Sequence, residues 1–549
     1  MAIKGRDKEF RLPKVSYVDY KHIEIDRTLL NLFPRLKFNG FLGRARVRVQ
    51  MITVEKFLED FKDDKYRDKF RGFSEHEDIV RKWLETDILD LVNRGRLSQA
   101  VVSPRPLHGN TYKFRNTKHA RDYSTSEQLY WMLNYARNGL GQAACDDLKS
   151  LLFEGLDINT DQILTSSKID VETQAILHLD SQVQDEADSK LPERYPPLCV
   201  GQGDLLADDV LRLLAYKSYM PRSVLIEYLK ILFSFHLGLY HLRLLKLLPT
   251  LVRRQGGDPI CAMQSCPMQP KNALPHGACP HRIGIVVDMV DRQNPHMSEL
   301  ARRSAEAHYR RIPPFIQAMF ITKKLDEMAS YLCSINKMAQ PASGFFAVGD
   351  VLQLLQSARA QDRENYFQSR LANLIESSGS DGALDPETKR VTEMGLGAFE
   401  TYIEILVALR GRFHREYLTR CLDSLLLKNS DARLLSQSRA KGSPRSFTLG
   451  SRLLEVLLQV AVLSPKGASF QTREIRVEDL LSFLRERYGL FIDRLPADDG
   501  FSNPSIIDRE ATRRNVETFK TRLREIGFFQ DLSDAYVTQT VTPRYTILG

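Results

Sequence analysis

The sequence lacks the short motifs that would identify an ATPase, a metalloprotease or a serine hydrolase. Its 549 residues contain no G-x-x-x-x-G-K-[ST] loop to hold phosphates, no His-Glu-x-x-His pair and no G-x-S-x-G turn. The pair Gly201 and Gly203 follows a proline-rich break rather than a strand, so a dinucleotide-binding turn also lacks support. These activities are disfavoured, whereas an enzyme whose catalytic residues are scattered along the chain stays open.

A long apolar run free of charge is also missing. The most apolar stretch, residues 223–252, has the length of a membrane span but carries Glu227, Lys230, Arg243 and Lys246. Charges at bilayer depth are costly, so we predict one long central helix, or two helices, of a soluble core. The N-terminal residues are charged from position 4 and contain no apolar signal-peptide core. We therefore expect a cytoplasmic protein with no membrane partner.

Cysteine is scarce and odd in number. The chain has seven cysteines, of which four stand alone in predicted helices or loops. Isolated thiols do not make a disulfide framework, and we interpret them as small buried apolar groups. These four are Cys145, Cys199, Cys333 and Cys421.

The other three cysteines fall in residues 256–281, a run with neither helical nor strand periodicity. A Cys-x4-Cys pair is followed, 12 residues later, by a Cys-x-His pair, close to the two-plus-two spacing of a tetrahedral zinc site. Five prolines prevent regular hydrogen bonding, so a metal would anchor this loop. The predicted ligands are Cys261, Cys266, Cys279 and His281, with His276 as a substitute.

A filled four-ligand site leaves no water for the metal to activate, so we expect this zinc to be structural rather than catalytic. The alternative is a loop without metal that happens to carry thiols. Three local cysteines are too few for an iron–sulfur cluster to be favoured.

The charge balance is mildly basic, with 78 Lys and Arg against 69 Asp and Glu, so a basic surface must be sought locally. Residues 38–51 read as a strand in which arginine alternates with alanine and valine, which places the arginines on one face. They would contact phosphates, or else guard a solvated edge strand. These residues are Arg44, Arg46 and Arg48.

The last hundred residues read as three helices, at 452–462, 477–488 and 508–526, followed by a terminal hairpin of residues 535–540 and 544–548. This is the order of a winged-helix unit, whose third helix would enter the major groove of DNA. Winged-helix units also serve as protein–protein modules, and acids dilute the charge of the third helix, so both uses stay open. The predicted nucleic-acid contacts of this module are Arg513, Arg514, Lys520 and Arg544.

The predicted fold class is mainly α and multidomain, with a helical core, a zinc-loop insertion and a C-terminal winged-helix-like module. Linkers are predicted at 376–386 and 436–446, and a helix over 388–428 has a predicted break around 410–413. The predicted domains are a basic α+β domain at 1–125, a helical core at 126–375 with the zinc loop at 256–283, a helical segment at 387–435, and the winged-helix-like domain at 447–549.

Residues 283–291 form a short apolar run that ends in acids, and we predict a buried strand that ties the loop to the core. Asp288 and Asp291 are typical magnesium ligands in type, but no further acidic pair follows at a useful spacing. A metal-dependent nuclease is therefore the alternative, with these two residues as its first candidates.

The run RLPKVSYVDYKHIEIDRTLLNLFPRL near the start, with the cysteine loop and the terminal helical module, resembles the large accessory proteins of bacterial anti-phage defence systems of the methylation-associated type. Such proteins act beside a DNA methyltransferase and restriction or ATPase subunits. The resemblance implies a DNA-directed assembly partner in a bacterium, and no role of a single residue is carried over.

Together these observations predict a non-catalytic subunit of a larger complex that binds nucleic acid or acts as a scaffold and carries a structural zinc. DNA and other protein subunits are the expected partners. A metal-dependent nuclease or other DNA-processing enzyme, and a pure protein–protein scaffold, are the two alternatives.

Overall fold

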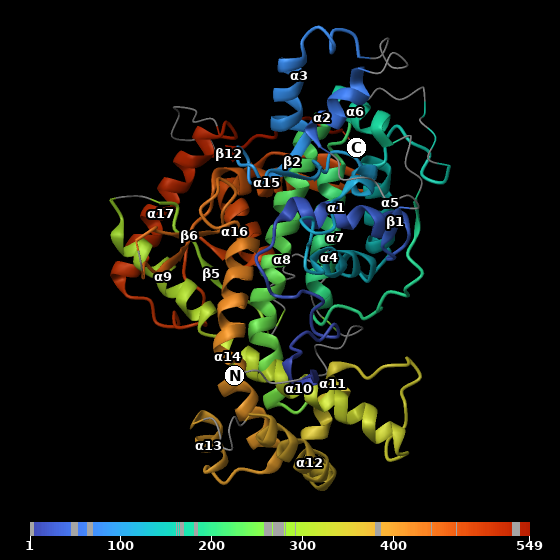
Figure 1. Cartoon of the computed structure of the whole chain (residues 1–549). Coiled ribbons are helices and arrows are strands. Elements are labelled where there is room, and N and C mark those ends of the chain that lie inside the picture. Colours follow the sequence, from blue (N-terminus) through green and yellow to red (C-terminus); the bar gives the residue numbers. More distant parts are fainter. Residues whose placement is uncertain are drawn as a thin grey trace. The chain divides into compact units, whose positions relative to one another are not determined.

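The structure is a computed structural model of the chain (Figure 1). It describes residues 5–45, 53–62, 70–160, 162, 164, 170–180, 185–256, 266, 279, 281–290, 293–378, 386–440, 442–467, 469–529 and 539–548. Most of these residues are in helices, and the strands pair only into two-stranded sheets, so the mainly α prediction is confirmed.

The chain divides into two compact units that interleave along the sequence, whereas the predicted domains follow one another between linkers. Unit 1 comprises residues 1–22, 195–206 and 234–549, and unit 2 comprises residues 23–194 and 207–233. Two helices contribute residues to both units, α7 (Val200–Leu214) and α8 (Arg222–Arg253).

Helix α8 is the apolar stretch of the sequence, folded as one helix of 32 residues. Its length and composition would allow a membrane span, but 94% of its most apolar window is buried inside the protein. This agrees with the predicted core helix. Its charged side chains have protein partners, as in the ion pair of Lys230 with Asp26 at 2.6 Å.

Unit 2 is a small helical unit with two strand pairs. Its helices are α1 (Ile25–Lys37), α2 (Val54–Lys62), α3 (Glu77–Trp83), α4 (Thr125–Asn134), α5 (Leu140–Leu152) and α6 (Val171–Asp180). Its strands are β1 (Gly43–Ala45) with β4 (Asp185–Ala187), and β2 (Leu89–Val92) with β3 (Ala100–Pro104), both antiparallel. Phenylalanines of α2 pack against the β2–β3 pair and α3 in a shared core that includes Phe57 and Phe61.

Apart from its portions of α7 and α8, unit 1 contains several helices of its own. Those before residue 430 are α9 (Pro295–Tyr309), α10 (Ile312–Ser334), α11 (Val348–Leu352), α12 (Ala360–Ser378), α13 (Pro386–Thr392) and α14 (Ala398–Leu425). The predicted break in the long helix was misplaced. The chain interrupts it at 393–397, where Gly395 has a φ of +65°, and α14 then runs through residues 410–413 unbroken.

The last part of unit 1 alternates helices with short strands. Its elements are β6 (Leu435–Gln437), β7 (Arg445–Phe447), α15 (Ser451–Ala461), β8 (Leu463–Lys466), β9 (Ser469–Thr472), β10 (Ile475–Arg476), α16 (Val477–Tyr488), β11 (Leu490–Phe491), α17 (Ile506–Glu525) and β12 (Thr540–Val541). Both ends of the predicted linker at 436–446 instead belong to strands, because β6 and β7 form an antiparallel pair. The three predicted helices are confirmed as α15, α16 and α17, within two residues at each end.

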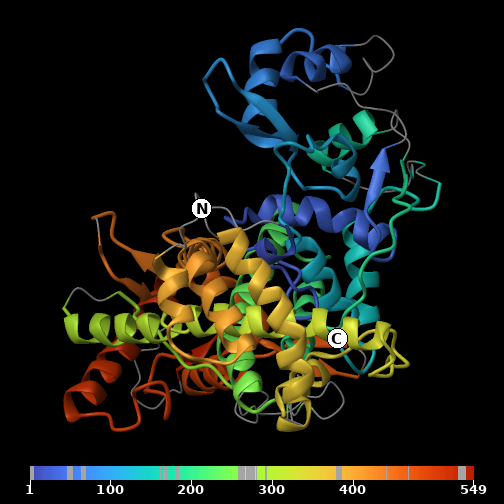
Figure 2. The same ribbon diagram turned by 60° about the horizontal axis from the view of Figure 1, so that its bottom comes forward.

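The apolar run after the cysteine loop is confirmed as a buried strand, β5 (Ile285–Val286). It pairs in parallel with β11, through Ile285 opposite Leu490 and Val286 opposite Phe491. Helix α9 packs over it through Met297 and Leu300, and Ala511 of α17 joins the same apolar cluster. In both views α17, drawn in red, lies beside α9, drawn in yellow-green (Figure 1 and Figure 2).

Candidate nucleic-acid interface

Helix α17 begins at a complete capping box. The hydroxyl of Ser505 accepts a hydrogen bond from the Asp508 amide at 3.1 Å, and the Asp508 carboxylate accepts one from the Ser505 amide at 2.8 Å. Such reciprocal capping fixes the first turn of a helix. The Asp508 carboxylate also accepts a hydrogen bond from His296 Nε2 at 2.7 Å, which ties the same turn to α9.

A single buried amide holds the middle of α17. Asn515 donates to the carbonyls of Val287 at 2.9 Å and Ile492 at 3.0 Å, and it accepts from the Met289 amide at 2.9 Å. One side chain thus satisfies backbone groups beside β5 and β11 that would otherwise be buried without partners. The orientation of α17 about its own axis is therefore set by Asn515.

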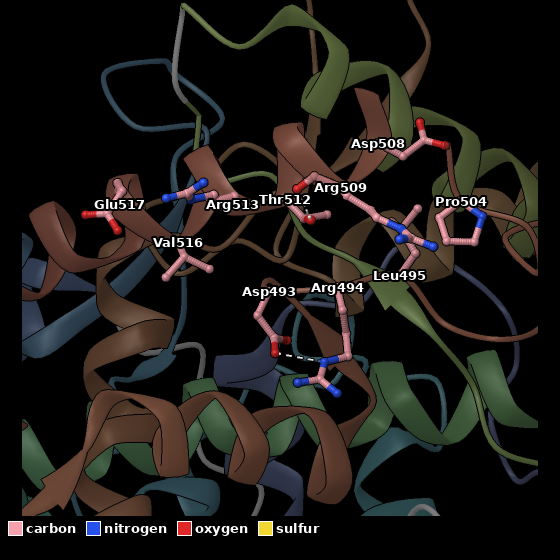
Figure 3. A pocket seen from close by; sticks show the side chains of 10 residues that line it. All are labelled: Asp493, Arg494, Leu495, Pro504, Asp508, Arg509, Thr512, Arg513, Val516 and Glu517. Atoms are coloured by element: carbon pink, nitrogen blue, oxygen red, sulfur yellow. Dashed lines mark hydrogen bonds and ion pairs between the residues drawn. The ribbon is translucent and has the colours of Figure 1, made fainter. Parts of the chain in front are cut away.

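With that face anchored, another face of α17 lines a pocket of about 500 Å³. The α17 residues that line it recur at positions 508, 509, 512, 513, 516 and 517, which is one stripe along a helix. The opposite wall comes from the segment after β11, and Figure 3 shows both walls. That wall consists of Asp493, Arg494, Leu495 and Pro504.

Each carboxylate of this pocket already has a cationic or hydrogen-bonding partner. Asp493 accepts from Arg485 at 2.7 Å and from Arg494 at 2.9 Å, and Figure 3 shows the Arg494 guanidinium turned toward it. Glu517 pairs with Lys520 at 3.0 Å. Burial works against ionisation of Asp508, but the hydrogen bonds from His296 and Ser505 outweigh it and hold the pKa of this carboxyl below its usual value.

The two remaining cations of the pocket are Arg509 and Arg513, one helical turn apart. Both are exposed, and among the described residues neither guanidinium has an ion-pair or hydrogen-bond partner. Figure 3 shows both side chains projecting from α17 along the pocket wall. A pair of uncompensated guanidinium groups at this spacing suits phosphate oxygens, which guanidinium groups bind through two parallel hydrogen bonds.

Apolar side chains flank these arginines. Ile506 is 85% exposed and Ile507 is 65% exposed, both in the first turn of α17. A second, smaller pocket of about 230 Å³ shares Arg494 and Leu495 with the first and is also lined by Arg282 and Arg485. This part of unit 1 therefore offers positive charge, a hollow and exposed apolar groups together.

The strand after α17 returns to the segment before α16. Thr540 and Val541 of β12 pair antiparallel with Arg476 and Ile475 of β10, and Phe529 forms an isolated antiparallel bridge with Val541. Residues 530–538 lie outside the described residues, as does most of the first predicted hairpin strand. The second predicted strand was wrong, because residues 544–548 form no strand.

The predicted basic residues of this module differ in their surroundings. Arg513 faces the pocket, whereas Arg514 pairs with Glu510 at 3.2 Å and Lys520 pairs with Glu517. Arg544 pairs with Glu455, donates to the Ile526 carbonyl and lies over the Phe528 ring at 4.4 Å. Arg544 therefore fastens the end of the chain to α15 and α17.

Of the predicted N-terminal arginine strip, only Arg44 is described. It lies in β1, opposite Glu186 of β4, while Arg46 and Arg48 lie outside the described residues. The strip stays a prediction. The charged pocket residues that were not among the predicted contacts include Arg509 of α17 and the pair Asp493 and Arg494, which follow β11 without any motif.

The predicted zinc ligands are only partly described, because Cys261 and His276 lie outside the described residues. Cys279 and His281 are buried, at 7% and 4% exposure, and Cys266 packs against Cys279 and Leu205. Arg243 Nη1 lies 3.5 Å from Cys279 Sγ. Within the described part of the chain no three His, Cys, Asp or Glu side chains gather as a metal site. The zinc therefore stays a prediction.

Asp288, the first nuclease candidate, is 3% exposed. Its carboxylate accepts hydrogen bonds from the Ser298 hydroxyl at 2.6 Å and the Val290 amide at 2.7 Å. Val290 itself has a φ of +65°, so this hydrogen bond supports a strained turn. Asp291 lies outside the described residues. The described carboxylate is engaged in holding the backbone.

The family model described as methylation-associated defense system protein MAD7 matches residues 5–545 of the chain. No curated protein and no solved structure matches it.

Proposed function

Because the chain belongs to the family of the methylation-associated defense system protein MAD7, we propose that it is the duplex-DNA-binding subunit of such a system, with α17 as its reading helix. The resemblance to anti-phage defence proteins seen in the sequence is thus confirmed. A component of a defence system works with other subunits of that system, and DNA is the partner that we add.

The observation that carries this proposal is the pair Arg509 and Arg513. Two other arginines of α17 form ion pairs with carboxylates three or four residues away, Arg514 with Glu510 and Arg522 with Glu525 at 2.7 Å. Neither Arg509 nor Arg513 forms an ion pair with a described residue, so their charge is available to an external anion. Phosphate oxygens supply most of the affinity of proteins for DNA.

The order of elements supports the same proposal. Helix α15, strand β10, helices α16 and α17, the bridge at Phe529 and strand β12 occur in the order of a winged-helix unit. Strands β8 and β9 are inserted after α15, and β11, which pairs with β5, is inserted between α16 and α17. In such units the N-terminal residues of the third helix meet base edges in the major groove. Ile506 and Ile507 stand at that end of α17, where apolar side chains would meet thymine methyl groups.

The two alternatives have less support. A nuclease centred on Asp288 would need a carboxylate that can reach a metal, and this one is buried and hydrogen-bonded to the backbone. The pure scaffold alternative does not explain why Arg509 and Arg513 have no ion-pair partner among the described residues. The structural zinc remains part of the proposal, as an anchor for the loop between α8 and β5.

The test is binding of the full-length protein to fluorescein-labelled duplex DNA across a series of salt concentrations. The variant Arg509→Glu/Arg513→Glu should bind at least tenfold more weakly, and the slope of log affinity against log salt should fall by about 0.9 per lost phosphate contact. The matched control is Arg514→Glu/Arg522→Glu, which makes the same charge change on the same helix at arginines that are already paired.

The proposal predicts a clearly smaller loss of affinity for the control than for the pocket variant. Equal losses would mean that only net charge matters, and would remove α17 as the reading helix. Magnesium-dependent cleavage of the duplex by the wild type, lost in Asp288→Ala, would replace the binding subunit with the nuclease alternative.

A further inference from the structure

A second cationic surface lies on α14, and among the described residues only one of its cations has a carboxylate partner. Four residues at intervals of three, four and three make one stripe along this helix, about 15 Å long at the usual rise per residue. We call this stripe, together with Lys21, the aromatic–cation stripe. Its members are Lys21, Arg410, Phe413, Tyr417 and Arg420. Figure 1 shows α14 as a single straight helix, drawn in orange.

The N-terminal strap, residues 5–22, brings Lys21 to this helix. Within unit 1 the strap is held by ion pairs to α10, as in Lys14 with Asp326 at 2.5 Å and Asp7 with Lys324 at 3.1 Å. Its Phe10 ring stacks on His414 of α14, with ring centroids 4.0 Å apart. The position of Lys21 beside α14 is therefore built into the fold.

Aromatic rings, rather than acids, hold the cations of the stripe. Lys21 Nζ lies 3.5 Å from the Tyr417 ring centroid and 5.3 Å from that of Phe413. The Arg410 guanidinium lies 4.4 Å from the Phe413 ring, and the two rings are 4.5 Å apart. Cation–π contacts orient a cation without cancelling its charge.

The stripe therefore keeps an excess of positive charge. Only Arg420 has a carboxylate partner among the described residues, Glu416 at 2.5 Å. Burial, followed by the charges of Arg410 and Lys21, lowers the pKa of the neighbouring His414 to about 3. On α9, by contrast, the exposed Arg310 pairs with Glu306 of its own helix at 2.6 Å.

An aromatic surface accompanies this charge, since the Phe413 ring is 39% exposed although it is apolar. Single-stranded nucleic acid matches both properties, because its phosphates pair with cations and its unstacked bases lie against aromatic rings. The bases of duplex DNA are stacked on one another inside the helix, so they do not stack on an exposed aromatic ring. An acidic protein would match the charge alone, because the negative face of a ring repels carboxylates.

We propose that the aromatic–cation stripe of α14 binds single-stranded nucleic acid, with a base against Phe413 and Tyr417 and phosphates on Lys21 and Arg410. This site lies apart from α17 in the sequence and goes beyond the proposed duplex-binding function, on which it does not rest. A protein that held both a duplex and a single strand would be suited to DNA whose strands have been separated.

The test uses the full-length protein and fluorescein-labelled oligothymidylate, followed by fluorescence anisotropy. The variant Phe413→Leu/Tyr417→Leu keeps the charges and most of the apolar volume but removes both rings. We expect about a tenfold loss of affinity, within the range for losing a stacked base. The matched control is Tyr331→Leu, which removes an aromatic side chain of α10 that is 46% exposed.

Two further measurements separate this site from α17 and from a purely electrostatic surface. The Leu double variant should bind duplex DNA as the wild type does, while Arg509→Glu/Arg513→Glu should keep its oligothymidylate affinity. Unchanged oligothymidylate binding by the Leu variant, or an equal loss in Tyr331→Leu, would overturn the proposal. So would competition by polyglutamate as effective as competition by unlabelled oligothymidylate of equal charge, because that would show an acidic partner to suffice.

Discussion

Mild acid should destabilise unit 1 much more than unit 2, because unit 1 contains three buried histidines with lowered pKa. Burial lowers the pKa of His241 to about 4, and burial with the charge of Arg311 lowers that of His308 to about 4. The pKa of His414 is about 3. These histidines stay neutral in the folded protein, but once exposed by unfolding they take up protons below about pH 6.5.

Because the unfolded state binds more protons, acid favours unfolding. The contribution of these histidines to the free energy of unfolding is fully present above pH 6.5, and it decreases as the pH is lowered toward the folded-state pKa values. Between pH 7 and pH 5.5 each such histidine lowers the free energy of unfolding by about 1.2 kcal/mol, so unit 1 should lose about 3.7 kcal/mol. Carboxyl groups contribute little over this interval, because their ordinary pKa values are near 4.

Unit 2 has one comparable residue, His108, whose pKa is lowered to about 3 by burial and then by the charge of Arg222. Its expected loss is about 1.2 kcal/mol over the same interval. Burial raises the pKa of Asp90. The folded state therefore binds a proton there more readily than the unfolded state, and this carboxyl raises the free energy of unfolding of unit 2 as the pH falls. Unit 2 should therefore resist mild acid.

The chain offers a direct assay, because both of its tryptophans, Trp83 and Trp131, belong to unit 2. Urea unfolding followed by tryptophan fluorescence reports unit 2, and far-ultraviolet circular dichroism reports the helices of both units. The dichroism midpoint should drop further than the fluorescence midpoint between pH 7 and pH 5.5.

The variant His414→Phe tests the cause. The Nε2 atom of His414 is buried without a hydrogen-bond partner among the described residues, and its ring stacks on Phe10, so phenylalanine fits the site. The acid-induced loss in unit 1 should shrink to about 2.5 kcal/mol, because two titrating histidines remain. A variant that loses as much as the wild type, or fluorescence and dichroism midpoints that shift equally, would refute the reasoning.

Two further predictions concern the predicted zinc ligands and Arg544. Metal analysis of the purified protein should give about one zinc per chain, and Cys261→Ser should lower both the zinc content and the stability of unit 1; a fully folded wild type without metal would contradict this. Arg544→Gln should lower the free energy of unfolding by about 1–3 kcal/mol, because the buried Glu455 loses its close partner and keeps only Arg452, at 3.7 Å, while duplex affinity stays unchanged; a loss of affinity without a loss of stability would return Arg544 to the DNA surface.

Helices with a clear apolar stripe could be predicted from the sequence almost to the residue. In α15 the buried Leu453, Leu454, Leu457 and Leu458 follow the helical period. Polar capping residues precede the other two helices, Arg476 before α16 and Ser505 before α17. The β6–β7 pair could not be predicted, because four of its six residues are polar and its strand β7 packs against α9, which is remote in the sequence. The misplaced helix break has a similar origin, since Gly411 weakens a helix locally but α14 is stabilised by packing against α10 and α12.

The candidate site illustrates a harder limit. Glu510 could pair with either Arg513 or Arg514, and Glu517 could pair with either Arg513 or Lys520, since all four spacings suit a helix. The structure pairs Glu510 with Arg514 and Glu517 with Lys520, which leaves Arg513 uncompensated. The three backbone hydrogen bonds of Asn515 help to hold the face of α17 that carries Arg513 along the pocket. The aromatic–cation stripe depends on a still longer connection, since Lys21 reaches α14 only because the N-terminal strap is anchored on α10. A charge becomes available to a ligand when the fold withholds its local partner, and that is a property of the tertiary structure rather than of any motif.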